Sequence, residues 1–303
     1  MNNIQSPINY IGGKAKLLDQ IMPLFPKKID KFVDLFCGGC NVGLNVDAKK
    51  VYYNDNNFQL IKLYNILLKY NKKDIVNKIY EIIDNYNLSL VSKYGYDYYD
   101  CTSSEGLGKY NKDKFNKLKL DFNGMKKNDK AYLLLYVLIV YAFNNQIRFN
   151  SKGEYNLPVG KRDFNKKMEN KLYKFVERIN NQDCEFTCED FRNYDIQKLT
   201  NNDFVYIDPP YLITCASYNE NGGWTENDEK SLLTMLDVLN ENKVNFAMSN
   251  VLTNKGNTNN VLNKWINEHN NLNVYHLNYN YSNCNYHTKN KFETCDEVLI
   301  TNY

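Results

Sequence analysis

The chain has 303 residues, of which 43% are hydrophobic and 24% are charged, and its formal net charge is +3. These values are ordinary for a soluble globular protein, and the length allows one large domain or one domain with a sizeable insertion. The net charge is too small for nucleic-acid binding to be argued from the total, so only a local basic surface could support it.

The cysteines and the longest apolar run exclude two further classes. Cys37 and Cys40 form a C-x-x-C, but a second pair at zinc-finger spacing is missing. The chain is large and shows no signal peptide, so we expect free, reduced thiols in a cytoplasmic protein. The longest apolar run, 131–143, is too short to cross a bilayer and indicates a buried helix.

The first motif in chain order is a glycine pair, Gly12-Gly13, followed by Lys14 and an amphipathic stretch. Glycines just before a helix let backbone N–H groups approach a ligand, and the helix start favours an anion. Lys14 would add a positive charge for a carboxylate or phosphate. The spacing does not match a phosphate-cradling P-loop, and an ordinary turn is the alternative.

Residues 31–36 predict a strand, and Cys37–Gly43 predicts a tight turn into a helix. A strand, a glycine turn and a helix make the first half of a nucleotide-binding βαβ unit. The next predicted strand, 50–53, ends at Asn54-Asp55. In such units an acid about 20 residues after the glycine loop holds a ribose by its hydroxyls, which is the role we expect for Asp55. Its alternative role is to cap a helix that begins near Phe58.

From about 57 to 174 the pattern is mainly helical, and 144–162 predicts a hairpin around Asn-Ser-Lys-Gly. The hairpin is rich in Asn, Gln, Arg and Lys. Asn and Gln can read adenine edges and Arg can read guanine, whereas Lys152, Lys161 and Arg162 could contact phosphates. A solvated hairpin with no ligand is the alternative.

The α/β pattern resumes with a predicted strand at 184–188 and another at 203–207. The second leads directly into Asp208-Pro209-Pro210-Tyr211, where two prolines forbid continuing the ladder. Ligands bind just outside the carboxyl ends of strands in open α/β sheets. An acid and an aromatic ring at that place suit a planar base with an amino group. A strand-ending turn is the alternative.

The remaining chain completes the sheet. A polar loop at 212–223 is suited to a mobile lid. We expect a helix at 228–241, a strand at 244–249, a helix at 261–268, and final strands at 272–277 and 297–301.

These motifs, in this order, resemble the Dam-type DNA adenine methyltransferases over nearly the whole chain. The resemblance implies an α/β fold, with a Rossmann-like catalytic domain of mostly parallel sheet in 1–56 and 175–303. It implies a mainly helical inserted target-recognition domain with a β-hairpin in 57–174. The residues that would bind S-adenosylmethionine are Tyr10, Gly12, Lys14, Asp34, Phe36, Cys37, Gly38, Gly39, Asp55, Asp190, Phe191 and Asp208.

The resemblance also implies the reaction, which is methyl transfer to the exocyclic amino group of a flipped-out adenine in duplex DNA. Asp208 and the carbonyl of Pro209 would accept the two amino hydrogens, Pro210 would keep the turn rigid, and Tyr211 would stack on the base. Positioning and electrostatics would then carry the rate. The residues expected to contact DNA are Asn9, Asn144, Gln146, Arg148, Asn150, Lys152, Pro158, Lys161 and Arg162.

The expected partner is double-stranded DNA, with no membrane, in a bacterial or bacteriophage-encoded cytoplasmic protein. A cognate restriction endonuclease acting separately is compatible with this interpretation. Family members that methylate GATC usually carry a lysine where this chain has Asn9 and an apolar residue at Gln146, whereas Arg148 and Pro158 match. The recognition sequence is therefore open.

Two other functions stay open. One is a methyltransferase acting on another planar nitrogen, in RNA adenine, cytosine or glutamine. Those families usually carry Asn or Ser in place of Asp208, which favours DNA adenine. The other is a catalytically silent DNA-binding protein, which the presence of Asp34, Asp55, Asp190 and Asp208 disfavours.

Overall fold

The computed structural model describes residues 3–214, 223–278 and 295–303. The chain forms two compact units, each built from several segments. The first unit consists of Met1–Gly13, Gly38–Leu44 and Asn57–Phe186, and the second of Lys14–Cys37, Asn45–Asn56 and Thr187–Tyr303. These bounds are not those of the two predicted domains, because the N-terminal segment and the glycine loop pack with the helices.

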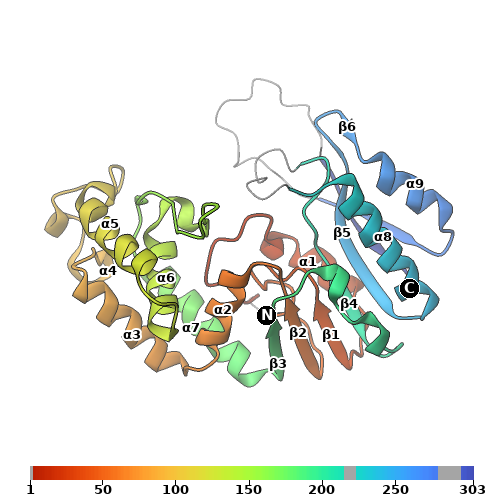
Figure 1. Ribbon diagram of the computed structural model, residues 1–303, viewed down its shortest axis with the longest axis horizontal. Helices are drawn as coiled ribbons and strands as arrows, with labels where there is room; N and C mark the ends of the chain where they lie inside the picture. The colour runs from red at the N-terminus through yellow and green to blue at the C-terminus, as the bar shows by residue number, and fades with distance from the viewer. Residues whose placement is uncertain (1–2, 215–222, 279–294) are drawn as a thin grey trace. The chain divides into compact units, whose positions relative to one another are not determined.

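A mostly parallel sheet organises the second unit (Figure 1). The strand order is β3-β2-β1-β4-β5-β8-β7, with β6 beside β5; β3 lies at the boundary of the two units and contributes Thr187 to the second. β1 pairs in parallel with β2 and β4, β4 pairs in parallel with β5, and β8 runs antiparallel to both β5 and β7. The strands are β1 (Lys31–Asp34), β2 (Lys50–Asn54), β3 (Cys184–Thr187), β4 (Phe204–Ile207), β5 (Asn245–Asn254), β6 (Asn257–Thr258), β7 (Asn273–Leu277) and β8 (Cys295–Thr301).

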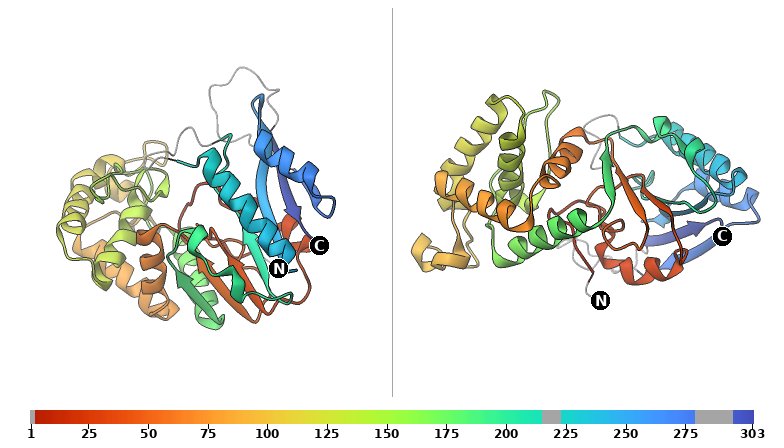
Figure 2. Two further views of the ribbon diagram at one scale, coloured as in Figure 1. Left: turned by 45° about the vertical axis from the view of Figure 1, so that its right-hand side comes forward. Right: turned by 90° about the horizontal axis from the view of Figure 1, so that it is seen from below.

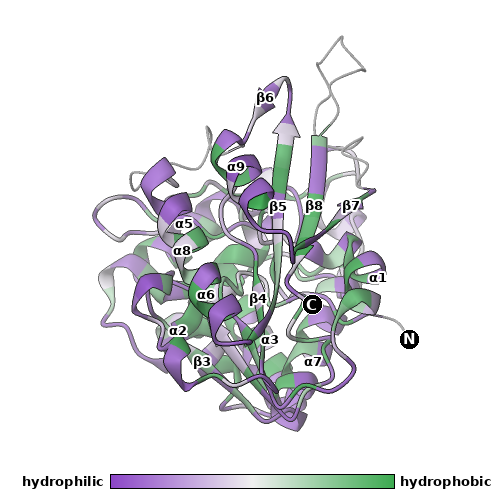
Figure 3. Cartoon of the chain, turned by 90° about the vertical axis from the view of Figure 1, so that its right-hand side faces the viewer, coloured by the Kyte–Doolittle hydropathy of each residue, from purple (hydrophilic) through white to green (hydrophobic). Residues whose placement is uncertain are grey.

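Apolar residues of the strands form the core of this unit. β4 is buried along its whole length, as expected for a central strand of a parallel sheet. Helix α8 (Glu226–Glu241) packs Leu232, Leu236 and Leu239 into the same cluster as Val205 and Phe246. Figure 2 shows α8 running across the strands, and Figure 3 shows β8 turning from hydrophilic at its start to hydrophobic beyond.

Local signals explain where the helices of the second unit begin. Thr225 and Asp228 form a capping box at the start of α8, and the Asn259 side chain accepts from Leu262 N at the start of α9 (Asn260–Glu268). The amphipathic stretch after Lys14 forms one short helix, α1 (Leu18–Ile21), with 3₁₀ turns at Lys14–Lys16 and Met22–Leu24 on either side. Later in the second unit, further 3₁₀ turns form at Phe191–Asn193 and Ile196–Lys198.

The first unit is mainly helical, as the periodicity predicts. Its central helix, α6 (Asp129–Tyr141), is buried on nearly all sides from Ala131 onward and is capped by Asn128. The other helices are α2 (Phe58–Leu67), α3 (Lys72–Asn85), α4 (Val91–Tyr94), α5 (Gly108–Gly124) and α7 (Lys166–Asn181), with 3₁₀ turns at Asp97–Tyr99 and Phe143–Asn145.

The predicted hairpin is present after α6, although it forms isolated bridges instead of regular strands. Ala142 pairs with Val159 and Phe149 pairs with Tyr155, both antiparallel. Gly153 adopts a φ of +74° in the loop, a left-handed conformation that suits glycine.

Two local predictions need correction or resolution. The helix predicted after the glycine loop is wrong, because residues 41–45 form only turns, with one helical bond from Leu44 N to the Cys40 carbonyl. The helix that begins at Phe58 is capped by Asn57, so Asp55 is not its N-cap. Most of the predicted lid, at 215–222, lies outside the described residues.

Candidate active site

Asp208 stands at the carboxyl end of β4, between the neighbouring strands β1 and β5. The strand ends there because Pro209 and Pro210 have no N–H for the ladder. The Asp208 side chain is 17% exposed, so its carboxylate lies in a mostly dry environment at the edge of the sheet. This is the position at which open α/β sheets bind ligands.

Three polar side chains surround this carboxylate and form a cluster of four with it. Lys14 Nζ lies 2.7 Å from Asp208 Oδ1 and 3.7 Å from Glu297 Oε1. The Tyr211 hydroxyl lies within donating distance of the same two atoms, at 3.1 Å and 3.3 Å. The Lys14 ammonium also lies 5.0 Å from the centroid of the Tyr211 ring. Lys14, Asp208, Tyr211 and Glu297 are called the four-residue cluster below.

The surroundings shift the proton equilibria of the cluster. Burial raises the pKa of the Asp208 carboxyl, and the neighbouring Lys14 ammonium and Tyr211 hydroxyl act in the opposite direction. Burial, followed by the charges of Asp208 and Glu297, raises the pKa of Tyr211 well above its usual value. Tyr211 therefore stays a neutral hydrogen-bond donor at neutral pH.

A second part of the site lies at the carboxyl ends of β1 and β2, where Asp34 and Asp55 are almost fully buried. Asn54 connects the segments here through its side-chain amide. Its Nδ2 donates to the carbonyls of Leu35 and Glu189, and its Oδ1 accepts from Thr187 Oγ1 and Glu189 N, all within 3.0–3.1 Å. The backbone at these strand ends is thus held rigidly around the two carboxylates.

Three aromatic rings form a cluster in the same unit. The centroids of Phe36, Phe191 and Trp224 lie 5.4–5.8 Å from one another. Trp224 is oriented by its indole N–H, which donates to the buried carboxylate of Glu229 at 2.6 Å. An aromatic cluster in the same unit as two buried carboxylates suits a nucleoside, whose base packs on apolar rings and whose ribose hydroxyls donate.

The predicted residue Asp190 lies beside this aromatic cluster. Asp190 accepts from the backbone and guanidinium of Arg192, which also pairs with Asp228. The Arg192 guanidinium lies 4.7 Å from the Phe191 ring centroid. Asp190 therefore fixes the turn that carries Phe191.

The glycine loop and the N-terminal motif come together in the first unit. Gly38 has a φ of +44°, and a Cβ there would stand 2.7 Å from Cε1 of Tyr10, so only glycine fits. The Gly38 carbonyl accepts from the Tyr64 hydroxyl at 2.8 Å. Gly39 is less confined, since a Cβ there would stand 3.1 Å from Ser6 Oγ and 3.1 Å from Asn41 Nδ2.

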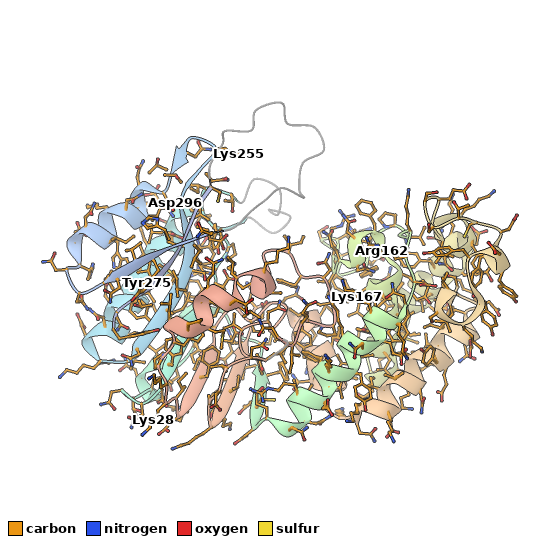
Figure 4. All side chains as sticks on the ribbon, turned by 180° about the vertical axis from the view of Figure 1, so that it is seen from behind. Lys28, Arg162, Lys167, Lys255, Tyr275 and Asp296 are labelled. Atoms are coloured by element: carbon orange, nitrogen blue, oxygen red, sulfur yellow. The ribbon has the colours of Figure 1, made fainter. Side chains whose placement is uncertain are left out.

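The predicted DNA-contacting residues also lie in the first unit. Asn9 Nδ2 donates to the Asn144 carbonyl at 2.9 Å, so these two residues meet although they are far apart in the chain. Arg148 Nε donates to Asn156 Oδ1 at 2.8 Å across the hairpin. Figure 4 labels Arg162, which is exposed like most of the set. Gln146 and Asn150 are half-buried, and the exposed residues are Asn9, Asn144, Arg148, Lys152, Pro158, Lys161 and Arg162.

The structure therefore groups the predicted residues in two sets. The second unit contains most of the predicted cofactor-binding residues and the catalytic candidates: Lys14, Asp34, Phe36, Cys37, Asp55, Asp190, Phe191 and 208–211. The first unit contains all the predicted DNA-contacting residues, together with Tyr10, Gly12, Gly38 and Gly39. Lys14, predicted for the cofactor, lies on Asp208.

Sequence reasoning missed Glu297, Trp224, Glu229 and Asn54. The one available signal was Glu297, a charged residue directly before an apolar strand segment.

The sequence profile of the family described as D12 class N6 adenine-specific DNA methyltransferase matches residues 10–294. The modification methylase StsI of Streptococcus sanguinis is 41% identical over 99% of this chain, and the type II methyltransferase M.FokI of Planomicrobium okeanokoites is 40% identical over 99%. The chain spans 43% of the length of each of these two relatives.

The DNA adenine methylase of Escherichia coli strain K12 is 31% identical over 70% of this chain and 66% of that protein. Among the residues that the structure describes, no helix is both long and apolar enough to cross a membrane. The family match extends over most of the chain and includes strands β1 to β7, with Asp208 at the carboxyl end of β4. The chain belongs to the D12 class of N6 adenine-specific DNA methyltransferases.

Proposed function

We propose that this protein is a site-specific DNA adenine methyltransferase that uses S-adenosylmethionine. The observation that carries the proposal is the buried Asp208 carboxylate at the end of β4, followed directly by Pro209, Pro210 and Tyr211. Family membership supports the reaction class, and the two modification methylases that match over 99% of this chain support a role in DNA modification.

The proposed chemistry of Asp208 follows from its position. The nucleophile is the amino nitrogen of adenine, whose lone pair is delocalised into the ring. Asp208 and the Pro209 carbonyl accept the two amino hydrogens and thereby localise that lone pair on nitrogen. The Tyr211 ring stacks on the base and holds it in line for attack. A base within a duplex cannot reach this edge, so the adenine is flipped out.

The residues for the cofactor fit its chemical groups. S-adenosylmethionine supplies an electrophilic methyl group when it is bound. Asp55 and Asp34 offer carboxylates to the ribose hydroxyls and the charged amino-acid end, and Phe36 and Phe191 offer an apolar face to the adenine ring. The family resemblance alone supports a role in this binding for the remaining residues, which are Tyr10, Gly12, Cys37, Gly38, Gly39 and Asp190.

The hairpin of the first unit is the proposed reader of the target sequence. Arg148 has the geometry to donate to guanine, and the exposed Lys152, Lys161 and Arg162 supply charge for the phosphates. The recognition sequence is a matter for experiment, because Asn9 and Gln146 differ from the residues usual in GATC methylases.

The direct test supplies the purified protein with labelled S-adenosylmethionine and, in separate reactions, plasmid DNA, RNA and a glutamine-containing peptide. We expect N6-methyladenine in DNA alone, at one recurring sequence when the modified positions are mapped. Label in cytosine, in RNA or in the peptide would replace this function with another. An Asp208→Ala protein run in parallel distinguishes turnover from a contaminating activity.

A further inference from the structure

Glu297 is a buried carboxylate for which neither the fold nor the proposed chemistry accounts. Its side chain is 3% exposed, at the point where β8 passes from polar residues to the buried Val298, Leu299 and Ile300 (Figure 3). A buried carboxylate destabilises a protein unless it is paired and hydrogen-bonded. Its partners in the structure include Lys14 and Tyr211, both of which also contact Asp208.

Glu297 and Asp208 share the same two donors. Lys14 Nζ is closer to Asp208, at 2.7 Å against 3.7 Å, and the Tyr211 hydroxyl is almost equidistant, at 3.1 Å and 3.3 Å. A hydroxyl has one hydrogen, so Tyr211 makes a full bond to one carboxylate at a time. The cluster thus has two alternative pairings of the same donors.

The proposed reaction needs Asp208 as an acceptor for the adenine amino group. Each donor that is held on Asp208 Oδ1 draws electron density from that carboxylate and weakens it as an acceptor. Lys14 would need to move only about 1 Å to reach the distance of a charge-assisted bond with Glu297. The ammonium stays paired in both arrangements, so the exchange leaves no buried charge alone.

We propose that Glu297 is a positioning residue that takes over the Lys14 ammonium and the Tyr211 hydroxyl when the target adenine engages Asp208. This inference rests on the proposed function, because it concerns the same carboxylate. Within the four-residue cluster of the described residues, Asp208 is the one carboxylate that remains for Lys14 in a Glu297→Gln protein. The amino group then competes with an ammonium for Asp208, and the loss of a neighbouring negative charge lowers the pKa of Asp208.

The test measures single-turnover methylation of a DNA duplex that the wild-type protein modifies. We expect Glu297→Gln to slow the methyl-transfer step at least about tenfold, while the dissociation constants for S-adenosylmethionine and duplex stay within about threefold. The acid limb of its pH–rate profile moves to lower pH. Glu297→Asp, which keeps the charge, restores part of the rate and leaves the acid limb near its wild-type position.

Asp296→Asn is the matched control. Asp296 is the preceding residue of β8, labelled in Figure 4, and it pairs with His276 at the surface, with Oδ1 and Nδ1 2.7 Å apart. We expect this variant to keep the wild-type rate. A double-mutant cycle adds a test that partial misfolding cannot imitate: Glu297→Gln should slow the reaction less in a Tyr211→Phe background than in the wild-type background.

The inference is overturned if Glu297→Gln keeps the wild-type rate and acid limb. It is also overturned if the fall in rate equals the fall in the fraction of folded protein and the acid limb does not move. Full additivity of the two substitutions also overturns it. A wild-type protein that makes no methyladenine on any DNA overturns the proposed function and this inference with it. An active wild-type protein with an unaffected Glu297→Gln variant overturns the inference alone.

Discussion

The Lys14 ammonium lies 2.7 Å from Asp208 Oδ1, and both side chains are largely buried. The contact pairs the carboxylate with a positive charge, and it joins Lys14 to the segment 208–211 within the second unit. Substitutions at either end should therefore alter the reaction more than the fold.

Asp208→Asn should reduce the methyl-transfer rate at least about 100-fold, because an amide is a weaker acceptor and presents donors to the amino group. Its shape is retained, so binding of S-adenosylmethionine should change by less than about threefold. Single-turnover rates and calorimetric titration measure the two effects separately. Wild-type turnover in this variant would contradict the role assigned to Asp208.

The reaction should have an acid limb above the pH range in which an ordinary aspartate titrates, because burial raises the pKa of Asp208 and only the ionised carboxylate is a good acceptor. Activity should rise as pH increases through that pKa. The same shift means that the contribution of Asp208 to stability is present at low pH and is lost as pH rises through its folded pKa. Rates measured from pH 4 to pH 8 under saturating conditions locate the acid limb to within about one pH unit. Thermal unfolding at each pH measures the change in stability.

Arg148→Ala should relax or abolish sequence preference while cofactor binding survives. A bidentate contact to guanine contributes about 1–3 kcal/mol of discrimination, or roughly fivefold to 150-fold. Sequencing of the methylated positions gives the preference directly. Lys167→Ala, an exposed change on α7 labelled in Figure 4, is the control and should leave the preference intact. Unchanged site preference in Arg148→Ala would exclude a reading role for this hairpin.

Trp224 should report cofactor binding through its fluorescence, since its ring packs on Phe36 and Phe191. The chain has two tryptophans, so Trp265→Phe leaves Trp224 as the reporter. Adding S-adenosylmethionine should change the emission of Trp265→Phe in a saturable way and should leave that of Trp224→Phe unaffected. Trp224→Ala should weaken cofactor binding up to about tenfold. A response that persists in Trp224→Phe would place the cofactor elsewhere.

Asn54→Ala should lower the free energy of unfolding by about 2–4 kcal/mol, because it removes four hydrogen bonds and leaves the backbone carbonyls of Leu35 and Glu189 with one partner fewer. Denaturant titration measures the loss. The exposed Asn202→Ala is the control and should stay within about 0.5 kcal/mol. An equally small effect at Asn54 would show that the strand ends are held by packing alone.

The sequence was sufficient for the sheet, the helices and the main motif, because each depends on local patterns. The buried run before Asp208 and the prolines after it specify a strand end without reference to the rest of the chain. Asp55 was also placed correctly, at the end of β2, by its spacing from the preceding strand. Such features are encoded within a few residues of where they occur.

The partners of these residues were less predictable, because they depend on tertiary packing. Nothing near Glu297 in the sequence indicates that it meets Tyr211, and nothing near Lys14 indicates Asp208. The helix predicted after Gly43 failed for a related reason. Cys40 has a positive φ of 60°, and residues 37–44 are buried throughout, so tertiary contacts fix this loop in a conformation that a glycine turn alone does not specify.

The four-residue cluster also constrains how the protein can fold. Its members come from the start, the middle and the last strand of the second unit, whose chain is interrupted by two of the three segments of the first. Contacts between such distant segments form late, after the loops between them have been closed. A partly folded chain therefore has the Asp208 motif but not the charges around it, and recovery of methyl transfer during refolding should lag behind recovery of helix content.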